Sequence, residues 1–213
     1  YEAIQDYNQA IAIDPDYADA LFNRAYAYEQ VGRIDDALVD ISYVKNMFPD
    51  SAYVYFYEGI LLANKKSFDA GIEAFEKALQ LDGSNPETKV NLATLKFYNG
   101  EISDAKSRLE EVLRNDPEDA NALNTLSQIA LEQNRLAEAL KLINKALQIV
   151  PNEPYFVNNR GQIYLAMDSL GLAGDDINRS ILINPKNAWA YRNKGIYYAK
   201  KGQFEDAVRL YNE

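Results

Sequence analysis

The chain has 213 residues, of which 47% are hydrophobic and 25% are charged, a composition typical of a folded protein rather than a disordered one. It contains no cysteine and no histidine, which excludes disulfide frameworks, thiolate and imidazole metal sites, cysteine nucleophiles and histidine general bases. The 22 basic and 32 acidic residues give a formal net charge of −10, which argues against generic nucleic-acid binding because lysine and arginine must replace phosphate counterions.

No apolar run approaches the roughly 18 residues that span a bilayer, so the sequence predicts no membrane-spanning segment. The chain begins with Tyr1 instead of methionine, and we expect the native start to lie upstream of it. The lack of cysteine suits a reducing cytosol and an export route without disulfides equally, so no compartment is predicted.

A helix-breaking residue recurs every 34 residues, and no insertion or deletion interrupts this register. A small residue precedes each breaker by 12 positions, and a large apolar residue follows that small residue after four. The breakers are Pro15, Pro49, Gly83, Pro117, Pro151 and Pro185. Such a period predicts an array of similar structural units that stack on their neighbours.

Each unit is predicted to form two helices joined by a short turn. The first helices are expected at residues 18–31, 52–64, 86–98, 120–133, 154–167 and 188–200. Second helices follow them, for example at 35–47, 68–80, 102–114 and 136–149. Helices this short are marginal in isolation, so each pair must bury its apolar side against its neighbours.

The residues at the helix ends favour the same assignment. Residues that commonly cap a helix N-terminus precede four of the first helices: Ser51, Asn85, Asp119 and Asn187. Glycine marks the turn within three of the pairs: Gly32, Gly100 and Gly202. Two further glycines, Gly171 and Gly174, fall inside one second helix, which we expect to be the softest in the array.

Two arginine–aspartate pairs occur at one register and at the same separation of 16 residues, namely Arg24 with Asp40 and Arg160 with Asp176. We expect these arginines to bridge the helices of a repeat or to reach the preceding repeat. The adjacent carboxylates Asp35-Asp36 and Asp175-Asp176 point about 100 degrees apart on a helix, so they do not form a catalytic pair. No enzymatic activity, cofactor or metal is predicted.

This pattern resembles the tetratricopeptide repeat (TPR) family over the whole chain. The family spacing places an aromatic residue, Leu-Gly, Tyr, Ala-x3-Phe and Pro within 34 residues. The fifth repeat follows it as Val157, Arg160-Gly161, Tyr164, Ala173, Ile177 and Pro185. The resemblance implies an all-α fold, a right-handed α-solenoid of antiparallel helix pairs, in one domain over 1–213. Its parts are a half repeat 1–17, full repeats 18–51, 52–85, 86–119, 120–153 and 154–187, and a partial repeat 188–213.

The resemblance also implies that the first helices line a concave groove in which an extended peptide or a partner helix lies. Repeat positions 2, 5, 6, 9, 12 and 13 are taken as the exposed face, which is aromatic in the N-terminal half and rich in amides in the middle. The asparagines at position 6 resemble the ladder with which some family members hold peptides. The candidate groove residues are Phe22, Asn23, Tyr26, Tyr53, Phe56, Asn91, Asn124, Gln128, Asn158, Asn159, Gln162 and Asn193.

The expected function is therefore a protein-interaction scaffold that binds a protein or peptide partner. The lysine and asparagine pattern of the family's chaperone-tail clamp is missing, and the mildly acidic face favours neutral or basic apolar peptides. Phe22 and Phe56 can be groove or core residues. Two alternatives stay open, namely a self-association module that pairs through uncapped terminal helices, and an accessory domain of a larger multidomain protein.

Overall fold

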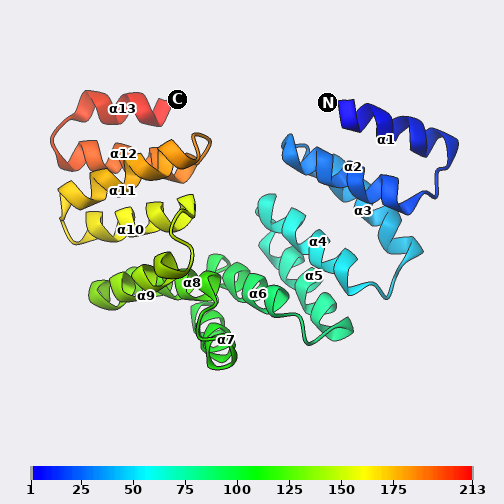
Figure 1. Ribbon diagram of the computed structural model, residues 1–213, viewed down its shortest axis with the longest axis horizontal. Coiled ribbons are helices and arrows are strands. Elements are labelled where there is room, and N and C mark those ends of the chain that lie inside the picture. Colours follow the sequence, from blue (N-terminus) through cyan, green and yellow to red (C-terminus); the bar gives the residue numbers. More distant parts are fainter. Residues whose placement is uncertain (1, 213) are drawn as a thin grey trace. The chain divides into compact units, whose positions relative to one another are not determined.

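The structure, a computed structural model, describes residues 2–212, and every regular element within them is an α-helix. The observed bounds lie within one residue of the predicted ones. In chain order (Figure 1) the helices are α1 (Glu2–Ile13), α2 (Ala18–Gln30), α3 (Ile34–Met47), α4 (Ala52–Asn64), α5 (Phe68–Leu81), α6 (Pro86–Tyr98), α7 (Ile102–Asn115), α8 (Ala120–Glu132), α9 (Leu136–Ile149), α10 (Pro154–Ala166), α11 (Leu170–Ile183), α12 (Ala188–Lys200) and α13 (Phe204–Asn212).

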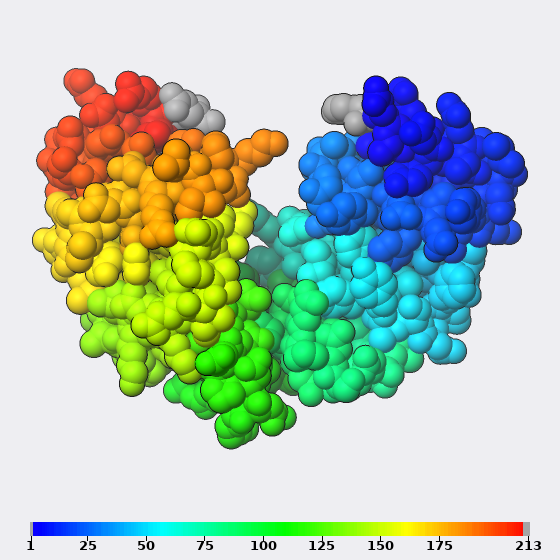
Figure 2. Space-filling view, viewed as in Figure 1, coloured from blue at the N-terminus to red at the C-terminus, as the bar shows by residue number. Residues whose placement is uncertain are grey.

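The helices gather into two compact units, Tyr1–Arg108 and Leu109–Glu213, which divide inside α7. Each helix from α1 to α6 packs against the next in the first unit, and each from α8 to α13 does so in the second. Figure 2 shows this order as successive bands of colour along each unit. The all-α fold of stacked helix pairs is thereby confirmed within each unit. Its extent as one domain over 1–213 stays a prediction.

First helices of neighbouring repeats also touch one another. In the first unit α4 contacts α6, and in the second unit α8 contacts α10, which contacts α12. The first helices of a unit therefore lie side by side and present one common face, on which the candidate residues are carried.

Small residues allow the two helices of a pair to approach closely. At Gly59 an added Cβ would lie 2.6 Å from the Phe75 ring, and at Gly161 it would lie 2.9 Å from Ile177 Cγ1. The large residues on the facing second helices, Ile41, Phe75, Leu109, Ile143 and Ile177, are almost completely buried. This register of small against large residues forms the core within each helix pair.

The predicted caps are confirmed at two of the four positions. The Asn85 side chain accepts a hydrogen bond from the Thr88 N–H at 3.0 Å, and Asp119 accepts one from Ala122 at 2.8 Å. Ser51 and Asn187 make no such bond. The buried Asn187 amide instead donates to Ser180 Oγ at 3.0 Å, because it lies close to the preceding second helix.

The turn within each pair contains one residue in the left-handed region, at a constant spacing of 34 residues. The three predicted glycines occupy it with φ between 75° and 86°. The other repeats place Lys66, Asn134 and Asp168 there, with φ of 63°, 56° and 57°. The backbone of the turn is thus the same whether or not glycine is present.

Both arginine–aspartate bridges are confirmed. Arg24 Nε and Nη2 donate to the two carboxylate oxygens of Asp40 at 2.8 and 2.6 Å, and its Nη1 donates to Asn8 Oδ1 at 2.7 Å. One guanidinium on α2 therefore connects the helix before it and the helix after it. The sequence predicts that these arginines bridge the helices of a repeat or reach the preceding repeat, and Arg24 and Arg160 each do both.

Candidate functional site

Three stacked aromatic rings and the exposed Tyr26 lie on α2 and α4, and together we call them the aromatic surface: Phe22, Tyr26, Tyr53 and Phe56. Phe22 stacks on Tyr53 with ring centroids 5.3 Å apart, and Tyr53 stacks on Phe56 at 6.2 Å. Tyr26 is 54% exposed and Tyr53 is 61% exposed. The surface therefore combines fixed ring positions with a large accessible aromatic area.

Phe22 and Phe56 belong partly to the core. Both are half-buried, and Phe22 also packs against the buried Tyr57 at 4.9 Å, whereas Phe56 packs against Phe75 at 6.0 Å. Their inner edges support the helix pairs, and their outer edges contribute to the aromatic surface. Alanine at either position would therefore reduce stability and alter the surface together.

Two depressions flank Tyr53 where the first helices begin. The depression between α2, α3 and α4 has a volume of about 420 Å³, and Phe22, Asn23, Phe48 and Tyr53 are among its lining residues. The depression between α4, α5 and α6 has a volume of about 200 Å³, and its lining includes Tyr53 and Phe56. The two lie one repeat apart, and Tyr53 contributes to both.

The amide residues of the second unit contact one another across neighbouring first helices. Asn159 Nδ2 donates to Asn124 Oδ1 at 2.9 Å, and Asn193 Nδ2 donates to Asn158 Oδ1 at 3.0 Å. These bonds join α8 to α10 and α10 to α12. The expected exposure of Asn158 and Asn193 is wrong, since they are only 1% and 3% exposed and already bond each other.

The remaining predicted amides differ in accessibility. Asn23 is exposed, and its amide donates to the Asp19 carbonyl at 2.8 Å. Asn91, Gln128 and Gln162 are half-buried. Gln128 Nε2 is buried and has no hydrogen-bond partner within the described residues.

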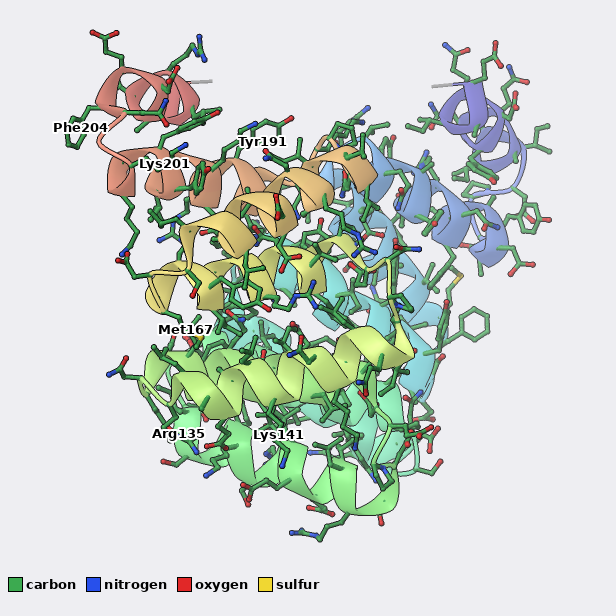
Figure 3. All side chains as sticks on the ribbon, turned by 60° about the vertical axis from the view of Figure 1, so that its left-hand side comes forward. Arg135, Lys141, Met167, Tyr191, Lys201 and Phe204 are labelled. Atoms are coloured by element: carbon green, nitrogen blue, oxygen red, sulfur yellow. The ribbon has the colours of Figure 1, made fainter. Side chains whose placement is uncertain are left out.

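Position 2 of the repeats is exposed in the second unit as well. Tyr155 and Trp189 occupy the position equivalent to Tyr53, and both are exposed. Arg192 lies over the Trp189 ring at 5.7 Å. Figure 3 shows this unit with its side chains, where Phe204 at the start of α13 points away from the helices.

Polar contacts support the first-helix face from beneath. Tyr57 donates to Glu29 Oε2 at 2.7 Å, and Asn64 donates to Glu29 Oε1 at 2.9 Å. Burial, followed by this hydrogen bond, raises the pKa of Tyr57 far above its usual range. The Tyr57 phenol therefore stays protonated and acts as a donor that fixes α4 against α2.

Lys96 is buried on α6 and is surrounded by carboxylates. Its Nζ lies 2.8 Å from Glu101, 3.1 Å from Asp104 and 3.6 Å from Glu76. The Lys96 bond, with a second from Asn99, lowers the pKa of Glu101. Sequence reasoning missed this cluster, because its acids lie on two second helices, α5 and α7, and in the turn before α7.

Sequence reasoning also missed Phe48, which is 50% exposed and lines the larger depression. The sequence does distinguish Phe48 from the residues at the equivalent position of other repeats. The equivalent residues Asp14, Asp82, Asp116 and Asn184 each accept a hydrogen bond from the backbone N–H two residues later. A phenylalanine that replaces such a turn-forming residue departs from the local rule.

Neither a metal site nor a membrane helix is found in the part of the chain that the structure describes. No three or more acidic side chains within residues 2–212 are grouped so that they could hold a metal ion. None of the described helices combines the length and the apolar character needed to cross a bilayer.

Sequence profiles for the family described as "Tetratricopeptide repeat" match residues 90–154, 177–209 and 52–85, and one described as "TPR repeat" matches residues 2–32. The small glutamine-rich tetratricopeptide repeat-containing protein 2 of Mycosarcoma maydis is 31% identical over 94 residues, or 44% of this chain and 27% of that protein. The chain thus spans little more than a quarter of this relative's length.

Solved structures share the fold. A chain of the APC/C hetero-tetramer Cut9–Hcn1 is similar with a TM-score of 0.80 and 20% identity, over 99% of this chain and 42% of that one. YrrB, a TPR protein with an unusual peptide-binding site, is similar with a TM-score of 0.54 and 20% identity, over 88% of this chain and 97% of that one.

Repeated helix pairs with an exposed first-helix face define a helical-repeat protein, a class whose members generally serve as protein-interaction scaffolds. The chain belongs to the tetratricopeptide repeat family.

Proposed function

We propose that this chain binds an extended or helical segment of a partner protein along the first-helix face of its repeats. The observation that carries the proposal is the aromatic surface, in which Tyr26 and Tyr53 stay more than half exposed beside rings that are packed into the core. Rigid aromatic side chains bury a large area on binding and lose little entropy, which is why they dominate interface energetics.

The amides of the second unit extend the proposed face. Gln128 and Gln162 lie at equivalent positions of consecutive repeats, and both are half-buried. Such groups can bond a peptide backbone without reading its side chains. Asn124 and Asn159 fix the spacing of the helices that carry them, whereas the buried pair Asn158 and Asn193 serves the fold alone.

Two relatives favour the same role. YrrB is described as a TPR protein with a peptide-binding site, and Cut9–Hcn1 is a hetero-tetramer. In our proposal the binding surface is the whole activity of this chain, with no catalytic step, no cofactor and no nucleic acid. The net charge of −10 favours a protein partner over a polyanion.

Affinity capture from the source lysate tests the proposal when two matched variants are compared. Tyr53 on α4 and Tyr43 on α3 are equally exposed at 61%, but only Tyr53 belongs to the first-helix face. We expect Tyr53→Ser to weaken capture about tenfold and Tyr43→Ser to leave it unchanged, with similar melting temperatures. Equal capture by both variants would contradict the proposal. A sedimentation series over protein concentration shows whether the captured partner is a second copy of the chain.

A further inference from the structure

The two depressions beside Tyr53 are the same feature in consecutive repeats. Position 5 is Phe22 in one and Phe56 in the other, and both depressions also contain the residues at positions 1, 2 and 27. They differ at position 31, which is Phe48 in the larger depression and Asp82 in the smaller one. The larger depression therefore presents a phenyl ring where the smaller one presents a carboxylate, although both linings mix polar and apolar surface.

Phe48 occupies this position without changing the backbone. Its φ of −127° and ψ of 67° are close to the values of −136° and 90° at Asp82 and of −132° and 95° at Asn184. The phenyl side chain cannot accept the turn hydrogen bond that Asp82 receives from Ser84 at 2.9 Å. The repeat therefore gives up one local hydrogen bond and exposes half of a large apolar side chain.

Acidic residues outnumber basic ones around the two depressions. Of the three cations that border them, Arg24 bonds Asp40, Lys45 pairs with Glu58, and Lys89 acts on Asp82 of the smaller depression. The segments 14–23, 46–56 and 82–88, which supply most of the lining, contain six acidic residues and no basic one. The acidic residues are Asp14, Asp16, Asp19, Asp50, Asp82 and Glu87, all of them exposed.

The same bias extends over the whole first unit. Residues 1–108 carry 10 basic and 18 acidic side chains, a formal charge of −8, whereas residues 109–213 carry 12 and 14, a formal charge of −2. A depression that holds the rings of Phe22, Phe48 and Tyr53 within an acidic surface complements an apolar side chain between cationic neighbours.

We infer that the depression between α2, α3 and α4 receives a large apolar side chain of a partner segment whose flanking residues are lysine or arginine. Phe22, Phe48 and Tyr53 contact the apolar side chain, and the surrounding acidic residues attract its cationic neighbours. This inference rests on the proposed function and adds to it the partner's chemistry and the place where its anchoring side chain is held.

Three fluorescein-labelled synthetic peptides of equal length test the inference by fluorescence anisotropy. One carries a leucine and phenylalanine core between lysines, the second carries the same core between glutamates, and the third carries an alanine core between lysines. We expect the first peptide to bind at least about tenfold more tightly than either of the others at low salt. The difference in affinity between the lysine and glutamate peptides should become smaller at about 300 mM salt, because salt screens the attraction between the acidic residues and the lysines.

Phe48→Asn is the informative variant, because asparagine restores the turn acceptor seen at Asn184 without adding charge. We expect this variant to bind the first peptide about tenfold more weakly, while its melting temperature stays the same or rises. Phe48→Leu should retain binding. Val150→Asn is the matched control, since Val150 holds the equivalent position in the second unit and is exposed too.

Three results would overturn the inference. If Phe48→Asn binds the first peptide with unchanged affinity, the proposed subsite is rejected. If the glutamate peptide binds as tightly as the lysine peptide, the cationic partner is rejected. If the unmodified protein does not bind the first peptide, both are rejected. The proposed function is judged separately by the Tyr53→Ser and Tyr43→Ser capture, which uses no synthetic peptide. If capture depends on Tyr53 and one of these three results is obtained, the first-helix face remains the binding surface, and the subsite, the cationic partner or both are rejected as stated.

Discussion

Arg160 and Asp176 form a two-point contact between α10 and α11. The arginine Nε and Nη2 donate to the two carboxylate oxygens at 2.7 and 2.8 Å, and its Nη1 donates to Asn144 on α9 at 3.1 Å. The bond to Asp176 raises the pKa of Arg160 despite partial burial. The same arrangement at Arg24, in the other unit, shows that three consecutive helices are connected through one planar side chain.

Removing one partner of this contact should be costly. Asp176→Asn leaves the guanidinium partly buried without its counter-charge, and we expect it to lower the free energy of unfolding by about 2 kcal/mol. Urea denaturation checks this value. The control is Asp36→Asn, which alters the exposed Arg33–Asp36 pair and should leave the midpoint nearly unchanged. Equal losses in the two variants would contradict the role assigned to the buried contact.

The Lys96 cluster predicts a specific pH dependence. Bonds from Lys96 and Asn99 lower the pKa of Glu101, and bonds from Arg108 and Lys96 outweigh burial to lower the pKa of Asp104. A lowered carboxyl pKa gives stability that is present above the unfolded pKa of about 4 and is lost as pH falls through the folded pKa.

Acidification should therefore destabilise the unmodified protein more steeply than Lys96→Met. The pKa of Lys96 is raised, chiefly by its bond to Glu101, so its own contribution is complete below about pH 10 and is lost above the raised value. Denaturation series from about pH 3 to pH 8 should give curves for the two proteins that converge toward the acid end. Parallel curves would show that the cluster does not couple folding to protons.

At the left-handed turn positions, introducing glycine and replacing glycine by alanine should have opposite effects on stability. Lys66→Gly should stabilise the protein by about 0.5–1 kcal/mol, because a side chain in this region is strained. Gly32→Ala should destabilise it by about 1 kcal/mol, since a Cβ there meets no atom within 4 Å and only the backbone is strained. Thermal unfolding of both variants checks the signs, and a loss of stability in Lys66→Gly would be inconsistent with this explanation.

The two glycines of α11 should behave differently. A Cβ at Gly171 meets nothing within 4 Å, so Gly171→Ala should stabilise the helix by about 0.5–1 kcal/mol. A Cβ at Gly174 would lie 3.0 Å from the Tyr197 ring, which would have to shift, so Gly174→Ala should stabilise the helix less than Gly171→Ala does. Hydrogen exchange of α11 amides, which the sequence predicts to be the fastest among the helices, should slow more in Gly171→Ala than in Gly174→Ala. Faster exchange in Gly171→Ala would count against the interpretation.

The helix bounds could be predicted closely from the sequence, because the residues that end or cap helices and the residues that pack between them indicate the same bounds in each repeat. Asn85 and Asp119 cap their helices as expected, and the small-against-large register places Gly59 against Phe75. Turn residues other than glycine were missed, since Lys66 carries no local signal for a left-handed backbone. The regular turn geometry is imposed by the helix pair that encloses it.

The candidate site was less predictable than the fold. The exposed rings of Tyr26 and Tyr53 follow from repeat position alone, but the burial of Asn158 and Asn193 depends on how far neighbouring first helices rotate toward each other. A one-sequence pattern specifies which face a residue occupies and leaves its depth between two helices undetermined. Phe48 shows the reverse case, in which a departure from the repeat marks a surface feature.

Site-specific photo-crosslinking tests the central claim most directly. A benzophenone amino acid is placed at Tyr53 in one preparation and at Tyr43 in another, two positions that are equally exposed at 61% on a first and a second helix. After irradiation in the source lysate, position 53 is expected to give a discrete adduct with a partner protein, and position 43 is expected to give none. An adduct at position 43 together with none at position 53 would contradict partner binding on the first-helix face.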